Sequence, residues 1–185
     1  QLTSRLAADA RAVIAAEPAL WRHLAAATDH IALCHWNANV DNAWFWRDGH
    51  GLRCGLMDWG CVSVMNVAMA LWGCLCSAET SMWDNHLGEL LALFAAEYEA
   101  FGGPVLDQSL LHDQLVLYAA VMGVAWLLEA PSYVRAAVPD LADVPDRFDP
   151  RISEIEPVRA QLLMLTNVLN LWETRDIAAL LDRIG

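Results

Sequence analysis

Hydrophobic residues recur with helical spacing over most of the chain and with strand-like spacing in one short segment. The alanine- and leucine-rich opening, residues 3–28, predicts two helices, because Pro18 interrupts it and proline cannot continue a helix. Thr3 or Ser4 is the expected N-cap of the first helix. From Gly60 onward the pattern predicts further helices almost to the end of the chain. Their approximate ranges are 64–77, 81–101, 107–130, 131–138, 153–173 and 174–184.

Several of these helix ends carry capping signals. Asp107 precedes one predicted helix, and its carboxylate is expected to accept hydrogen bonds from the first N–H groups of that helix. Ser153 is expected to cap another helix, with Glu156 three residues later completing a capping box. Prolines interrupt the acidic segment between them, residues 139–149, which we expect to be a loop.

The strand-like segment contains short apolar runs separated by turn-forming residues. Runs at 31–34, 43–46 and 52–57 predict three strands, and the glycine-rich turn at 48–51 predicts that the last two form a hairpin. We therefore expect a mainly helical α+β fold. It consists of two N-terminal helices, a small β-hairpin insert and a helical body, in a single domain over residues 1–185.

Composition and charge exclude several kinds of function. Hydrophobic residues make up 57% of the chain, enough for a buried core. The 11 basic residues face 23 acidic ones, for a net charge of −12, so we expect neither a nucleic-acid partner nor an anionic membrane surface. All the basic residues are arginines, so this chain cannot supply a lysine to any reaction.

Cysteine usage indicates a reducing environment. The five cysteines are odd in number and stand in apolar runs, which argues against a disulfide framework and favours the cytoplasm. The uncharged stretch at 59–78 is long enough to consider as a membrane span, but Ser63 and Asn66 within it favour a buried helix. No signal-peptide pattern is visible, and a chain that begins with Gln1 is expected to be a fragment or a processed form.

Candidate chemistry is concentrated between Leu33 and Gly60, where polar residues are set in apolar sequence. They are His35, Asn37, Asn39, Asp41, Asn42 and Asp58. The first five form a loop between two predicted strands, and Asp58 follows the hairpin, so we expect both segments to meet at one edge of a small sheet. Amide and carboxylate oxygens are ligands that magnesium accepts.

This pattern resembles the catalytic centre of the kinase-like family that contains aminoglycoside phosphotransferases, choline kinases and ecdysteroid-kinase-like proteins. That family has a His-x-Asp-x-x-x-x-Asn loop, a hairpin, and an Asp-Trp or Asp-Phe metal motif; the similar segments here are 35–42 and Asp58-Trp59. The resemblance covers residues 31–62 and implies a kinase-like C-terminal lobe. It implies that Asn42 and Asp58 bind the magnesium ions and the nucleotide phosphates, and that His35 braces the loop.

Two departures from the family pattern affect the expected activity. Asn37 stands where the family has its catalytic aspartate, and a neutral amide cannot accept a proton as a carboxylate does. Asp41 is a weaker candidate for the base. The glycine-rich loop and phosphate-binding lysine of an N-terminal lobe are absent from this sequence. Mg²⁺ and ATP, or another nucleoside triphosphate, would then be held mostly by an N-terminal lobe of the same natural chain.

The resemblance implies a phosphotransferase that uses ATP and magnesium to phosphorylate a hydroxyl of a small organic acceptor, which the sequence does not identify. In that reading Asn37 and His35 are the catalytic-loop positions. The alternative is a pseudokinase-like module that binds nucleotide or ligand without turnover. A third reading is a helical scaffold in which the asparagines only form turns.

Three further features bear on ligands and partners. Trp36 lies inside the loop and is a candidate for ligand stacking, although tryptophans more often fill cores. The acidic loop at 139–149 would favour a cationic acceptor such as an aminoglycoside or choline. An apolar face left uncovered without the N-terminal lobe would favour homo-oligomers.

Overall fold

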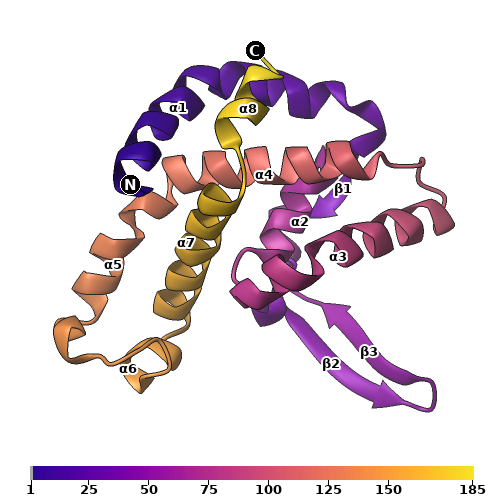
Figure 1. Cartoon of the computed structure of the whole chain (residues 1–185). Coiled ribbons are helices and arrows are strands. Elements are labelled where there is room, and N and C mark those ends of the chain that lie inside the picture. The colour runs from indigo at the N-terminus through magenta and orange to yellow at the C-terminus, as the bar shows by residue number, and fades with distance from the viewer. Residues whose placement is uncertain (1) are drawn as a thin grey trace.

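The structure is a computed structural model that describes residues 2–185. Its helices are α1 (Leu2–Ala26), α2 (Val67–Leu75), α3 (Thr80–Ala100), α4 (Gln108–Ala125), α5 (Ala130–Ala137), α6 (Pro150–Ser153), α7 (Glu156–Thr174) and α8 (Ile177–Asp182). Its strands are β1 (Ile31–His35), β2 (Ala43–Asp48), β3 (Gly51–Leu56) and β4 (Val62–Asn66). The expected mainly helical α+β fold is confirmed (Figure 1).

The central element is α4, whose side chains are buried on nearly all sides. Helices α1, α2, α7 and α8 pack around it, and Figure 1 shows it crossing the middle of the molecule. A smaller hydrophobic cluster joins α5, α6 and the start of α7 through Val134, Val138, Ile152 and Val158. The helical body therefore has one main core and a satellite core.

The N-terminal segment is one helix, so the prediction of two helices was wrong. Pro18 lies inside α1, and buried Val13 and Leu20 stand on either side of it. Packing of both halves against the core offsets the hydrogen bond that proline removes. Figure 1 accordingly shows α1 bending across the molecule without a break. The side chains of Thr3 and Ser4, the expected N-caps, lie outside the described residues.

The prediction of three strands was also incomplete, because residues 62–66 form β4 and not the start of a helix. The strand β4 pairs with β1 in an antiparallel sheet, with Ile31 opposite Asn66 and His35 opposite Val62. The predicted hairpin is confirmed as β2–β3, with Asp48 opposite Gly51. Pairing with β1, which lies before the β2–β3 hairpin in sequence, overrides the apolar pattern that suggested a helix.

The capping predictions had mixed outcomes. Asp107 caps α4, and its Oδ1 accepts hydrogen bonds from the N–H groups of Ser109 and Leu110 at 2.8 and 3.0 Å. The capping box of Ser153 and Glu156 was wrong, because Ser153 ends α6 and Glu156 is already the first residue of α7. The acidic segment at 139–149 ends in Asp149, and this residue is the N-cap of α6.

A buried polar network ties the small sheet to the helical body. Gln114 on α4 is fully buried, and its Oε1 accepts hydrogen bonds from His30 Nδ1 at 2.8 Å and from Asn66 Nδ2 at 3.0 Å. Asn66 Nδ2 also donates to the carbonyl of Leu24, and its Oδ1 caps α2 through the N–H of Ala68. The side chains of Gln114 and Asn66 together therefore connect α4 to the end of α1, to the small sheet and to α2.

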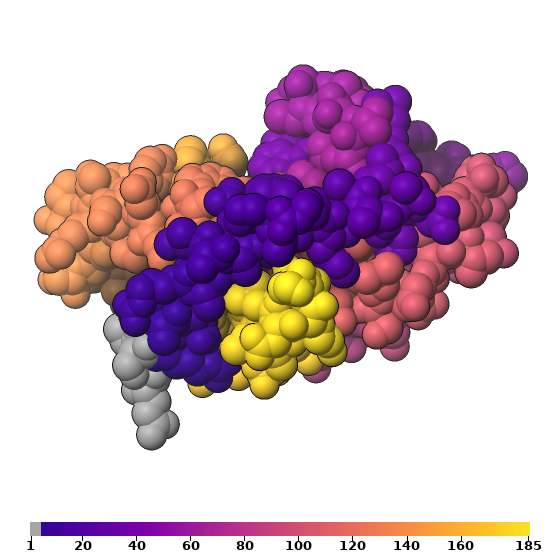
Figure 2. Space-filling view, turned by 90° about the horizontal axis from the view of Figure 1, so that it is seen from above, coloured from indigo at the N-terminus to yellow at the C-terminus, as the bar shows by residue number. Residues whose placement is uncertain are grey.

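The two ends of the described chain lie together. Figure 2 shows the C-terminal helix α8 seated against α1. Arg5 of α1 donates hydrogen bonds to the carbonyls of Trp172 and Arg175 just before α8, and Trp172 Nε1 donates to Asp9 at 3.1 Å. The C-terminal segment therefore stabilises the long helix that leads into the sheet.

Within residues 2–185 no single helix has both the length and the apolar character needed to cross a membrane. Only α4 taken together with the segment Leu127–Ala137, bent by 47°, meets those two criteria. The uncharged stretch at 59–78, expected to be one buried helix, is divided between a short turn, β4 and α2.

Replacing Asn66 by leucine should destabilise the fold. It leaves the buried Leu24 carbonyl without its hydrogen-bond donor and removes the N-cap of α2. We expect the free energy of unfolding to fall by about 3 kcal/mol, measured by urea denaturation. Asn170→Ala, which removes an exposed bond to Asp84, is the control and should change it by less than about 0.5 kcal/mol. Equal effects of the two substitutions would contradict the role given to the buried network.

Candidate functional site

The candidate site begins where β1 ends. The loop after His35 runs to a short 3₁₀ turn, Val40–Asn42, which leads directly into β2. Asn39 caps that turn, since its side-chain Oδ1 accepts a hydrogen bond from the N–H of Asp41 at 2.9 Å. The asparagine-rich sequence thus builds a folded loop of defined shape, as asparagine and aspartate favour.

His35 connects this loop to the segment that contains Asp58. It is 7% exposed, and its Nε2 lies 2.8 Å from the carbonyl oxygen of Met57. A carbonyl can only accept, so Nε2 carries the proton and donates. Trp59 packs edge-on against the His35 ring, with the ring centroids 4.8 Å apart. The residues on both sides of Asp58 are therefore held by His35.

Asn42 makes the second connection between the two segments. Its main-chain carbonyl accepts a hydrogen bond from the N–H of Met57 at 2.9 Å, and its side-chain Nδ2 donates to the carbonyl of Asn37 at 2.8 Å. Because Nδ2 is committed to that carbonyl, the amide oxygen Oδ1 is the atom with which Asn42 can coordinate a cation. The same side chain fixes the backbone of the loop at Asn37.

Asp58 has an unusual backbone conformation. It is exposed and lies in the left-handed region, with φ 56° and ψ 61°, and is the one non-glycine residue with positive φ among residues 2–185. Such a conformation costs on the order of 1 kcal/mol, although aspartate tolerates it better than most residues. A Cβ at Gly60 would come within 3.3 Å of Asp58 Oδ1, so glycine there leaves the carboxylate uncrowded.

The predicted metal residues fit a magnesium site in chemical type. Asn42 and Asp58 offer one amide oxygen and one carboxylate from segments that are bonded together at Met57. Within the described chain, histidine, cysteine, aspartate and glutamate side chains form no group of three or more able to hold a metal ion. Two protein ligands, completed by water and substrate phosphates, are how magnesium is usually bound.

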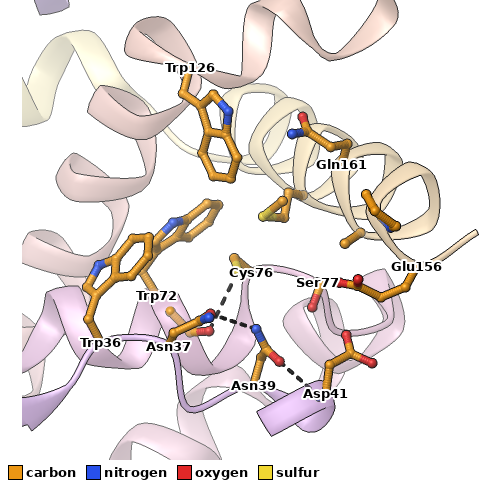
Figure 3. Close-up of a pocket in the computed structure, with 14 residues that line it drawn as sticks. Trp36, Asn37, Asn39, Asp41, Trp72, Cys76, Ser77, Trp126, Glu156 and Gln161 are labelled. Carbon is orange, nitrogen blue, oxygen red and sulfur yellow. Dashed lines mark hydrogen bonds between the residues drawn. The ribbon is translucent and has the colours of Figure 1, made fainter. Parts of the chain in front are cut away.

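Asn37 lines a cavity that neither Asn42 nor Asp58 lines, although its main-chain carbonyl is bonded to the Asn42 side chain. Its Oδ1 accepts a hydrogen bond from Asn39 Nδ2 at 2.8 Å. The cavity has a volume of about 250 Å³, and Asn37, Asn39 and Asp41 form one of its walls. Figure 3 shows Glu156 and Gln161 of α7 on the opposite wall. The other candidates from the sequence, His35, Asn42 and Asp58, do not line this space.

Tryptophans close much of the remaining wall. Figure 3 shows Trp36, Trp72 and Trp126 gathered on one side of the cavity. Trp36 Nε1 donates a hydrogen bond to the hydroxyl of Tyr118 at 3.0 Å, and burial raises the pKa of that tyrosine despite this bond. Trp36, the candidate for ligand stacking, therefore lines this cavity, while its polar edge is anchored in the core.

The loop approaches α2 so closely that only glycine fits at one position. A Cβ on Gly73 would lie 1.5 Å from the main-chain oxygen of Trp36. Three residues further along α2, burial raises the pKa of the Cys76 thiol to about 12. Cys76 also lines the cavity, and its burial favours the neutral thiol over the nucleophilic thiolate.

Asp41, the weaker candidate for a base, is engaged in an ion pair. Its Oδ1 lies 2.9 Å from Arg159 Nη2 on α7. This contact occupies one of the two carboxylate oxygens of Asp41 and ties the loop to α7. The acidic loop is tied down as well, because Arg147 makes a two-point bond to Glu79 at the start of α3, at 3.1 and 2.5 Å.

Sequence reasoning missed the far wall of the cavity. Trp126 follows the end of α4, while Glu156 and Gln161 belong to α7, and Arg159 of α7 pairs with Asp41 across 118 residues. No local motif marks these residues as site residues; only Glu156 stood out, and for a capping role. Only the packing of α7 beside α2 and the loop brings them to the site.

Comparisons with known proteins do not identify the chain: no protein-family model, no curated protein and no solved structure matches it.

Gly73→Ala should disrupt the packing of the loop on α2. We expect a loss of about 3 kcal/mol in the free energy of unfolding, because neither the Trp36 carbonyl nor the helix backbone can move freely. Gly88→Ala on α3 is the control, since a Cβ there meets nothing within 4 Å, and it should stabilise by up to about 1 kcal/mol. Urea denaturation of both variants measures this. If Gly73→Ala leaves the free energy of unfolding unchanged, the close approach of the loop to α2 is not required for stability.

Proposed function

We propose that this chain is the C-terminal lobe of a kinase-like small-molecule phosphotransferase, which uses ATP and magnesium to phosphorylate a hydroxyl of a small organic acceptor. The observation that carries the proposal is a pair of hydrogen bonds to the main chain of Met57. The His35 side chain and the Asn42 backbone both hold this residue, next to Asp58. The histidine and asparagine of the family-like loop thus contact the segment that carries the family-like aspartate.

The order of elements also supports the proposal. His35 and Val62 are opposite each other in the antiparallel pair of β1 and β4, so the loop leaving β1 and the segment entering β4 stand at the same end of one sheet. The β2–β3 hairpin lies between them in sequence. A strand, a polar loop, a hairpin and an aspartate turn follow each other as the resemblance implies.

In this proposal the residues have distinct roles. Asn42 Oδ1 and the Asp58 carboxylate would hold magnesium, which neutralises charge on the nucleotide phosphates. His35 is a positioning residue that acts through Met57. The acceptor would occupy the cavity of about 250 Å³ beside Asn37. An acceptor that carries an amine would find the Glu156 carboxylate and the indole faces of that cavity favourable.

Asn37 should slow phosphoryl transfer, but it does not remove the main contributions to the rate acceleration. Phosphoryl transfer depends chiefly on alignment and charge neutralisation, whereas general base assistance contributes about 10²–10⁴-fold. Asn37 can accept a hydrogen bond from the acceptor hydroxyl and so orient it, but it cannot take the proton. We therefore expect slow turnover at most, with nucleotide binding less affected.

The second candidate is a pseudokinase-like module that binds nucleotide or ligand without turnover. The pairing of Asp41 with Arg159 at 2.9 Å favours it, because the carboxylate nearest in sequence to Asn37 on the same wall is already neutralised. Both candidates share the fold and the metal residues, and they differ in whether phosphate reaches an acceptor.

Calorimetric titration with ATP and magnesium, on the longest natural form of the protein that contains this chain, tests the metal assignment. Asp58→Ala and Asn42→Ala should each abolish the magnesium-dependent part of binding, because each removes a direct ligand. Asp182→Ala, an exposed aspartate near the C-terminus, is the matched control and should bind like the native protein. Unchanged magnesium dependence in Asp58→Ala would overturn the proposed site.

Asn37→Asp separates the two candidate functions. Restoring a carboxylate at the base position should raise turnover of ATP against a panel of hydroxylated acceptors by about 10²-fold or more. Slow but measurable transfer by the native protein supports an enzyme. Binding without native transfer, followed by transfer in Asn37→Asp, supports the binding module. If neither form transfers phosphate, the phosphotransferase proposal fails.

A further inference from the structure

A second cavity lies between β1, α2 and α3, and it shares no lining residue with the cavity beside Asn37. Its volume is about 370 Å³. The elements that form it meet above the β2–β3 hairpin in Figure 1. Its wall includes Leu33, Leu71, Cys74, Phe94 and Tyr98, together with His35 and Trp59.

The chemistry of this wall selects against ions. None of the residues that line it is an aspartate, glutamate or arginine, although the chain as a whole carries a net charge of −12. Apolar and aromatic side chains predominate, and the Phe94 and Tyr98 rings stack with centroids 5.8 Å apart. Such a wall suits an uncharged molecule with an apolar body.

His35 provides this cavity with a hydrogen-bond acceptor. Because its Nε2 donates to the Met57 carbonyl, Nδ1 is the ring nitrogen that carries the lone pair in the neutral imidazole. That Nδ1 is buried and has no hydrogen-bond partner among the described residues. A buried polar atom without a partner is costly, so a ligand that supplies a donor there gains affinity.

Trp59 is the side chain that can give access to this atom. It packs on the His35 ring with centroids 4.8 Å apart, yet it is 54% exposed. Its Nε1 makes only a long bond of 3.4 Å to the Leu56 carbonyl. Trp59 also lines the cavity, so we expect its rotation to break few contacts and to open the His35 ring to a bound molecule.

We propose that the cavity binds a small uncharged molecule with an apolar body and one hydroxyl or amide N–H, which donates its hydrogen to His35 Nδ1. Binding there acts on the residue that holds Met57, next to Asp58. The site goes beyond phosphoryl transfer, since it requires neither ATP nor magnesium. If this cavity does not bind such a molecule, the proposed phosphotransferase activity is not affected. If that activity is absent, the cavity can still bind the molecule.

The probe is para-hexylphenol, and its methyl ether para-hexylanisole is the matched probe without a donor. Calorimetry on this chain should give saturable binding of the phenol, with the ether about fivefold weaker because one hydrogen bond is lost. Nitrogen NMR should show the Nδ1 resonance of His35 shifting with the phenol and staying in place with the ether. Comparable affinity of the two probes would overturn the role of His35.

Two exposed leucines on strands locate the binding site. Leu33 lines the cavity and is 73% exposed, while Leu52 is 61% exposed and does not line it. Leu33→Asp should weaken binding of the phenol at least about tenfold, because a carboxylate beside the apolar body is poorly solvated. Leu52→Asp should remain within about twofold of the native chain. Equal effects of the two changes would mean that the probe binds elsewhere, and absence of saturable binding would overturn the site.

Cys74 gives an independent readout, because it lines the cavity and is exposed, whereas Cys54 is exposed and does not line it. Desolvation by the apolar surroundings raises the pKa of the Cys74 thiol. Bound phenol should slow alkylation of Cys74 by a maleimide, measured by mass spectrometry of peptides, and leave Cys54 unchanged. Alkylation of Cys74 at the same rate with saturating phenol would contradict occupation of the cavity.

Discussion

The buried amide of Gln114 is the constraint on which the rest of the site depends. It accepts hydrogen bonds from His30, immediately before β1, and from Asn66, the last residue of β4. A slip of either strand by one residue would leave buried polar groups without partners, which costs far more than an apolar rearrangement. The register that sets Ile31 opposite Asn66 is thereby fixed, and with it His35 opposite Val62.

From that register the position of the loop follows. The loop starts at the end of the sheet where β4 begins, so His35 reaches Met57 and the backbone of Asn42 reaches it too. Close contact between Gly73 and the Trp36 carbonyl then presses the other side of the loop onto α2. A short segment is held by a strand, a hairpin end and a helix together, which gives its polar groups a defined geometry.

The same loop separates two cavities of different character. Trp36 and Asn37 line the polar and aromatic cavity, while His35 and Ala38 line the uncharged one. A ligand on either side therefore contacts a neighbouring residue of the same loop. The ion pair between Arg159 of α7 and Asp41 ties the loop wall of the first cavity to the helical body. Among the described residues, none that lines the second cavity takes part in an ion pair.

The sequence by itself determined the elements that depend on local preferences. Helical periodicity, the β2–β3 hairpin with its glycine turn, and the cap at Asp107 were all confirmed, because short-range sterics and hydrogen bonds decide them. The close spacing of His35, Asn37 and Asn42 also marked the loop correctly as a folded polar segment. Their chemical roles remain predictions.

Tertiary structure decided what local patterns could not. Pro18 stays inside α1 because both halves of that helix pack on the core, and residues 62–66 become a strand because β1 is there to pair with them. Glu156 faces the cavity beside Asn37 through the position of α7, although its local pattern suggested only a capping role. Contacts between segments distant in sequence leave no periodic signal, so only the packed chain reveals them.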